Sequence, residues 1–243
     1  MREPKILLWD IETTPVKCWI FRTGKQFINH KSIVEGERFE IICIAYKWSN
    51  QKKVNCLTWD KNQNSAKMVQ EFVEVLESSD VAIGQNADSF DVKQLNTQRM
   101  LHGQPPIAWP TTEDTRKQIK RHFYVTSSSL EYMSKLLTGS GKDRMEFDDW
   151  IDIVDKKSSK ALAKMVKYCK KDVKKLEEVW NRIAPYVTVK ASRARIMGIK
   201  NPACPKCGSP RVQKRGQRFL MSSTKQRYTC YSCLGSFETI LNS

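Results

Sequence analysis

Two Cys-x-x-Cys pairs near the end of the chain constrain its fold most strongly. Cys204 and Cys207 form the first pair, Cys230 and Cys233 form the second, and the 22 residues 208–229 separate them. A unit of about 40 residues is too small for a hydrophobic core alone, whereas two such pairs at this spacing are typical of a structural Zn²⁺ site. Disulfide pairing is the alternative, and a reducing compartment disfavours it. We therefore expect these four cysteines to hold one structural Zn²⁺.

The segment between the two pairs predicts a β-hairpin with strands at 211–220 and 225–228. Together with the cysteines it resembles a zinc ribbon, which we place at residues 203–243, after a basic connector at 189–202. From Lys190 onward eleven Lys and Arg residues oppose Glu238 alone, so this part carries +10 of the chain's total charge of +16. Such an excess favours a nucleic-acid partner. The aromatic residues expected to stack on bases are Phe219, Tyr228, Tyr231 and Phe237. A purely structural or protein-docking ribbon is the alternative.

The rest of the composition describes a folded protein outside the membrane. Of the 243 residues 40% are hydrophobic and 9% aromatic, which is too apolar for a disordered polycation. No apolar run approaches the ~20 residues that span a bilayer. The N-terminus runs from charged residues straight into a strand-like stretch without a signal-peptide pattern. We expect a cytoplasmic protein, or a protein of a host's cytoplasm, with no membrane partner.

The first 188 residues predict an α/β domain. Three apolar runs, at 5–9, 41–48 and 54–59, indicate a leading β meander, and then helices and strands alternate. A long amphipathic helix begins at Ser159 and ends near Pro185. The other expected elements are helix 66–77, strand 80–83, helix 90–101, a helix beginning at 112–115, and a helix from Ser129 that Gly139 ends.

Acidic residues recur at three places in this pattern. Asp10 and Glu12 end the first strand two residues apart, so both carboxylates lie on one face of the sheet. Asp91 opens a helix, where it could merely complement the helix dipole. Tyr168 and Asp172 are four residues apart on the long helix, at the edge of its apolar stripe. Taken singly, each place has an explanation that involves no function. The first could be a solvated strand end, the second a helix cap, and the third a pair at the boundary of the buried face.

Combined, these residues resemble the DEDD superfamily of 3′-5′ exonucleases. The ordered motifs are Asp10-Ile-Glu12, Asn86 through Phe90-Asp91, and Tyr168 through Asp172, over roughly residues 5–185. Tyr168 and the presence of Lys167 identify the tyrosine (DEDDy) branch, because the other branch carries His at position 167. Asp114-Thr115 and Ser129 to Leu137 also resemble ribonuclease-H-like exonucleases. The resemblance implies a ribonuclease-H-like mixed sheet with flanking helices.

The resemblance also implies a site and a reaction. Asp10, Glu12, Asp91 and Asp172 would hold two Mg²⁺ or Mn²⁺, with Asp10 bridging both ions. Glu12 and Asp172 would complete the ligands of the ion that activates water, and Asp91 would help to hold the other ion. Tyr168 has too high an ordinary pKa for a general base and is expected to orient the attacking water.

The predicted activity is 3′-5′ hydrolysis of single-stranded or frayed DNA to nucleoside 5′-monophosphates. RNA is the alternative substrate. A structure-selective endonuclease and a non-catalytic zinc-ribbon nucleic-acid-binding protein are the alternative functions. The completeness of the acidic set argues against the non-catalytic alternative.

Overall fold

The computed structural model describes residues 2–139, 145–200 and 202–241, so residue 201 of the predicted connector and the extreme ends of the predicted domains lie outside the description. A five-stranded sheet forms the centre of the larger part, in the order β3-β2-β1-β4-β5. Its strands are β1 (Ile6–Thr13), β2 (Ile41–Trp48), β3 (Asn55–Thr58), β4 (Val81–Gly84) and β5 (Thr111–Asp114). The first three strands are antiparallel, whereas β4 and β5 run parallel to β1. The predicted meander and mixed sheet are therefore confirmed.

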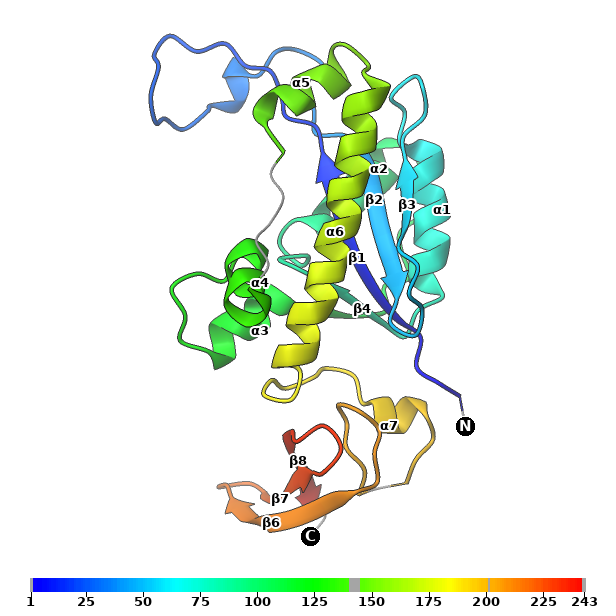
Figure 1. Cartoon of the computed structure of the whole chain (residues 1–243), viewed down its shortest axis with the longest axis vertical. Coiled ribbons are helices and arrows are strands. Elements are labelled where there is room, and N and C mark those ends of the chain that lie inside the picture. Colours follow the sequence, from blue (N-terminus) through cyan, green and yellow to red (C-terminus); the bar gives the residue numbers. More distant parts are fainter. Residues whose placement is uncertain (1, 140–144, 201, 242–243) are drawn as a thin grey trace.

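Helices cover both faces of this sheet (Figure 1). They are α1 (Ala66–Glu77), α2 (Asp91–Leu101), α3 (Thr115–His122), α4 (Leu130–Thr138), α5 (Phe147–Val154) and α6 (Ser159–Ile183). The alternation of side chains along β1 assigns its two faces. Trp9 packs against Phe72 of α1, with ring centroids 5.4 Å apart, whereas the next residue, Asp10, meets Cys169 of α6. The face covered by α6 is therefore the one that carries the acidic residues of β1.

Two elements differ from the sequence-based expectation. Residues 111–114 form strand β5 rather than a helical turn, and the helix begins only at Thr115 because Asp114 caps it by accepting a hydrogen bond from the Lys117 amide. Helix α5 was not predicted. Its N-terminus carries a reciprocal cap between Glu146 and Asp149.

The C-terminal part forms a second, three-stranded antiparallel sheet. Its strands are β6 (Val212–Phe219), β7 (Thr224–Cys230) and β8 (Ser236–Leu241), and β8 goes beyond the predicted hairpin. The preceding segment contains the short helix α7 (Arg193–Ile196). Val189, Ala191 and Ile196 pack against the main core, so this connector is attached to the larger part rather than free. The ribbon lies beyond the end of α6 (Figure 1).

Among the residues that the structure describes, no helix combines the length and the apolarity needed to cross a bilayer.

Candidate metal centres and active site

Strand β1 brings Asp10 and Glu12 together on the face beneath α6. Their carboxylate oxygens and the Cys169 sulfur all lie within 4.8 Å of one another. Cys169 faces the strand from α6, with its sulfur 3.6 Å from the backbone carbonyl oxygen of Asp10 and 3.7 Å from the Asp10 carboxylate. Both acidic side chains are only partly exposed. The arrangement offers hard oxygen donors at one point of the sheet surface.

Asp91 approaches the same point from the start of α2. Its carboxylate accepts a hydrogen bond from the backbone amide of Ile11 at 3.2 Å. Ile11 is the residue between Asp10 and Glu12. The Asp91 side chain is almost completely buried, and this burial raises its pKa to about 7. A cation placed beside it would favour the ionised form and reverse this shift.

The turn that precedes Asp91 is held in place by a buried acidic residue of β5. The Asp114 carboxylate accepts hydrogen bonds from the amides of Asn86 and Asp88, at 3.1 and 3.2 Å. Asn86 has a φ of 63°, in the left-handed region that Asn tolerates better than most residues. At Gly84 an added Cβ would come within 2.5 Å of the Ala87 Cβ, so the turn requires glycine there. These residues explain the Asn86 to Asp91 motif as a way of positioning one carboxylate.

Helix α6 supplies the remaining predicted residues. Asp172 and Tyr168 are 4% and 9% exposed, one turn apart, so the predicted pair lies on the packed side of the helix rather than on a solvated face. A hollow of about 330 Å³, the carboxylate hollow, is lined by Asp10, Ile11, Glu12, Gln85, Asn86, Phe90, Asp91, Arg116, Ser129, Leu130 and Asp172. All four predicted carboxylates therefore line one hollow. Tyr168 is not among the described residues that line it.

Two residues of the site were not singled out from the sequence. Cys169 occupied an apolar-stripe position, and only its burial was predicted. Hydrogen bonding to Cys43 and Cys56, together with burial, raises the pKa of the Cys169 thiol well above its usual value. The protonated thiol donates a hydrogen bond to the Asp10 carboxylate. Arg116 reaches the carboxylate hollow from α3, where its Nε donates to the Ser128 hydroxyl at 3.4 Å. No spacing signal could have selected Arg116 among so many basic residues.

An apolar hollow adjoins the carboxylate hollow. It measures about 320 Å³ and is lined by Ile11, Glu12, Thr13, Thr14, Pro15, Phe90, Phe147 and Trp150. Ile11, Glu12 and Phe90 line both hollows. Trp150 is held by a hydrogen bond from its indole nitrogen to the Thr13 carbonyl, at 3.1 Å. The carboxylates of the carboxylate hollow thus lie beside a surface with aromatic rings.

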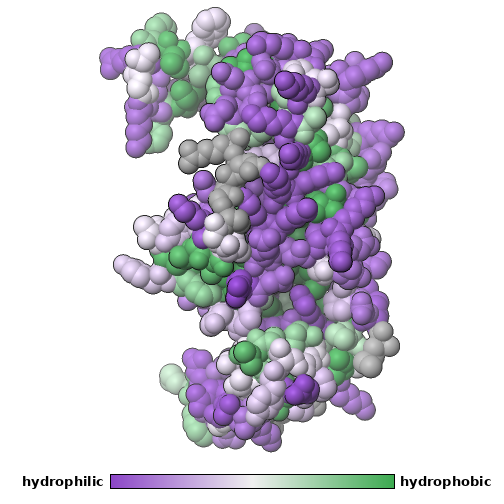
Figure 2. Space-filling model, viewed as in Figure 1, coloured by the Kyte–Doolittle hydropathy of each residue, from purple (hydrophilic) through white to green (hydrophobic). Residues whose placement is uncertain are grey.

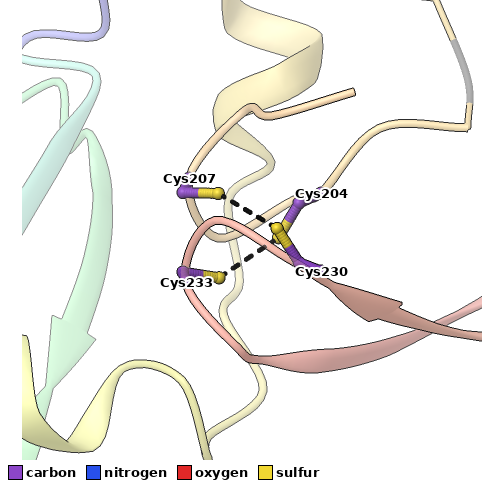
Figure 3. Close-up of side chains that lie close together, drawn as sticks. All are labelled: Cys204, Cys207, Cys230 and Cys233. Carbon is purple, nitrogen blue, oxygen red and sulfur yellow. Dashed lines mark hydrogen bonds between the residues drawn. The ribbon is translucent and has the colours of Figure 1, made fainter. Parts of the chain in front are cut away.

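The four C-terminal cysteines converge on one point (Figure 3). The Sγ atoms of Cys204 and Cys233 lie 3.7 Å apart, those of Cys207 and Cys230 lie 3.6 Å apart, and all four lie within 4.8 Å of one another. A disulfide would require about 2 Å. Tetrahedral zinc with Zn–S bonds of about 2.3 Å places sulfurs about 3.8 Å apart. The donor set and its spacing therefore fit zinc.

The ribbon meets the larger part at a basic hollow of about 640 Å³, the ribbon hollow. Five basic residues and one acidic residue line it, namely Lys206, Arg215, Arg218, Lys225, Arg227 and Glu238. Of the four aromatic residues predicted to stack on bases, Tyr228 and Phe237 instead pack on each other, with ring centroids 5.1 Å apart and planes 12° apart. Phe219 and Tyr231 are exposed.

Comparisons with known proteins support the fold. No family model and no curated protein matches the sequence. A family B DNA polymerase from the hyperthermophilic archaeon Pyrobaculum calidifontis is similar in structure, with a TM-score of 0.57 and 13% sequence identity. The match covers 76% of this chain and 25% of the polymerase. At this identity the likeness concerns the fold alone, and it agrees with a ribonuclease-H-like mixed α/β fold.

Proposed function

We propose that this protein is a metal-dependent 3′-5′ exonuclease that hydrolyses single-stranded DNA to nucleoside 5′-monophosphates. The observation that carries the proposal is the convergence of Asp10, Glu12, Asp91 and Asp172 on one hollow from β1, α2 and α6. Carboxylate groups in such number, partly or fully buried together, repel one another unless cations accompany them. Their oxygen atoms suit Mg²⁺ or Mn²⁺. The structural similarity to a DNA polymerase favours a nucleic-acid substrate.

The chain's own groups divide the chemical work. When bound, two divalent ions supply a nucleophile from water near neutral pH and neutralise charge on the leaving oxygen. Asp10, Glu12 and Asp172 would hold one ion, and Asp10 and Asp91 the other. The Ile11 amide fixes the Asp91 carboxylate, and Cys169 fixes Asp10. Arg116 is placed to bind a phosphate oxygen of the substrate, since its guanidinium belongs to the same hollow.

Tyr168 has a less direct role in this proposal. Tyr168 is not among the described residues that line the hollow. We assign its hydroxyl to orient the attacking water in the substrate-bound state, in which the hollow would have to open toward Tyr168. The apolar hollow offers Phe90, Phe147 and Trp150 to the nucleobases next to the scissile phosphate. Residues 1–188 are thus proposed to cut, and residues 203–243 to hold the strand through the ribbon hollow.

The deciding experiment uses 5′-labelled single-stranded DNA, duplex DNA and RNA with Mg²⁺, Mn²⁺ or EDTA. Products are resolved by length, and the released nucleotides are identified by chromatography. A ladder that shortens from the 3′ end, needs a divalent ion and disappears in Asp172→Ala supports the proposal. The matched control Asp148→Ala, an exposed acidic residue of α5, should cut like the natural protein.

Other outcomes point to the alternative functions. A discrete internal cut would identify a structure-selective endonuclease, and faster degradation of RNA an exoribonuclease. Binding without cleavage of any substrate would identify a non-catalytic binding protein. Undiminished cleavage by Asp172→Ala would contradict the proposed site.

A further inference from the structure

A projecting arm, residues 17–34, leaves the main body between β1 and β2 (Figure 1). Its base is a short antiparallel ladder in which Cys18 and Ile33 form a bridge. The Trp19 amide donates to the Ser32 carbonyl at 2.7 Å, and the Val34 amide donates to the Lys17 carbonyl at 2.9 Å. The Lys17 ammonium also pairs with Asp155, at the end of α5, at 2.7 Å. The base of the arm is therefore attached to the body.

The outer part of the arm exposes large apolar side chains. Every residue from 19 to 31 is exposed. Trp19 is 75% exposed, and Phe21 and Phe27 are completely exposed. Figure 2 shows the resulting apolar (green) cluster at the upper left of the molecule, bordered by hydrophilic (purple) side chains. So many exposed aromatic rings on one segment indicate a binding surface rather than chance exposure.

The charge of the arm selects the kind of ligand. The arm contains Lys17, Arg22, Lys25 and Lys31 and no acidic residue. Cations interleaved with exposed aromatic rings match single-stranded nucleic acid, in which phosphates alternate with bases that have flat π faces. A protein partner would need a groove that is both acidic and apolar. Single-stranded nucleic acid has both properties in every nucleotide, so we favour it as the ligand.

The position of the arm agrees with this ligand. Residues 13–16 connect Glu12 to the arm, and Thr13, Thr14 and Pro15 form one wall of the apolar hollow. The apolar hollow in turn shares Ile11, Glu12 and Phe90 with the carboxylate hollow. Only the four residues 13–16 therefore separate Glu12 from the arm in the chain, and three of them line the apolar hollow.

We propose that the arm binds single-stranded nucleic acid by stacking its bases on Trp19, Phe21 and Phe27. Arg22 and Lys25 lie between Phe21 and Phe27 in the sequence, Lys31 follows Phe27, and all three neutralise the neighbouring phosphates. The arm is thus a binding site additional to the carboxylate hollow and the ribbon. This inference rests on the proposed function only for the substrate class, since it involves no cleavage step.

The test measures binding of fluorescent single-stranded oligothymidine to the full chain in EDTA, so that no cleavage occurs. The variant Trp19→Ala/Phe21→Ala/Phe27→Ala removes the three rings, which make no described core contact. We expect its dissociation constant to rise at least about tenfold, because each ring removed takes away one stacking contact with a base. The matched control Met100→Ala/Leu101→Ala removes exposed apolar side chains at the end of α2 and should bind like the natural protein.

An abasic oligonucleotide of equal length separates stacking from charge. The natural protein should bind it more weakly than oligothymidine, and this difference should be clearly smaller in the triple variant, which keeps only the rings of the apolar hollow for contact with bases. Unchanged affinity of the triple variant would overturn the proposal and leave the rings to a protein partner. An equal loss on both oligonucleotides would also overturn it, since the rings would then not contact bases. A natural protein that binds in this way but never cuts would contradict the exonuclease and leave the arm assignment intact.

Discussion

The Ile11 amide donates a hydrogen bond to the Asp91 carboxylate, 3.2 Å away, although 80 residues separate them in the chain. Because Ile11 lies between Asp10 and Glu12, this bond fixes the carboxylate of α2 relative to both acidic side chains of β1. Burial of the Asp91 side chain raises its pKa to about 7, and the hydrogen bond from the Ile11 amide only partly offsets this rise. The site therefore stores an electrostatic penalty that a bound cation would relieve.

The first prediction concerns stability against pH in metal-free protein. An unfolded Asp has a pKa of about 3.9, and Asp91 in the fold has one of about 7, so the folded chain binds the extra proton between these values. The contribution of Asp91 to stability is fully present below about pH 4 and is lost as the pH rises through 7. Asp91→Asn keeps an oxygen acceptor for the Ile11 amide and cannot ionise.

We therefore expect Asp91→Asn to be more stable than the natural protein in EDTA at pH 8, by at most about 4 kcal/mol. The difference should shrink at pH 5. Urea unfolding at pH 5, 6, 7 and 8 measures it, with Asp148→Asn, an exposed acidic residue, as the control without a trend. Added Mn²⁺ should stabilise the natural protein more than Asp91→Asn. A pH-independent difference would show that Asp91 is ionised throughout this range.

The second prediction concerns Arg116. Because its guanidinium belongs to the carboxylate hollow, loss of a charge-assisted hydrogen bond to phosphate should lower kcat/KM about 10- to 100-fold in Arg116→Ala. Arg116→Lys should recover part of this loss, since it keeps the charge without the planar fork. Steady-state cleavage of a short oligonucleotide measures both, and Arg121→Ala, an exposed neighbour on α3, is the control. Equal activity of Arg116→Ala and Arg121→Ala would remove Arg116 from the substrate site.

The third prediction concerns the metal of the ribbon. The natural protein should contain one zinc per chain, and Cys207→Ser should contain much less, because it replaces one of four converging thiols. The small core beside the thiols, which includes Tyr228 and Phe237, should then lose its order, so that protease cuts within 203–241 while the larger part survives. Zinc analysis and limited proteolysis test this, with Cys18→Ser as the control. Full zinc content and protease resistance in Cys207→Ser would contradict the assignment.

The sequence predicted those features that depend on local pattern. Apolar runs and helical spacing located the central strands and α6, and the order of the acidic motifs predicted the fold. Features that depend on register between distant strands were not accessible. Tyr228 and Phe237 were expected to be free for bases, but the β7–β8 pairing places them opposite each other, where they stack. Likewise the position of Cys169 at Asp10 depends on the packing of α6 on β1, and Arg116 lines the carboxylate hollow only through the placement of α3 in the fold.

The last prediction concerns the ribbon hollow. Arg215, Arg218 and Lys225 line it and should bind phosphates, so changing all three to Gln should weaken binding of single-stranded DNA and reduce its dependence on salt. The slope of log K against log salt decreases by about 0.7 for each phosphate that the protein no longer neutralises, so the expected decrease is about 2. The control Lys53→Gln/Lys67→Gln/Lys93→Gln removes the same charge from exposed positions on the larger part. If both triple variants changed the slope equally, net charge rather than the ribbon hollow would account for binding.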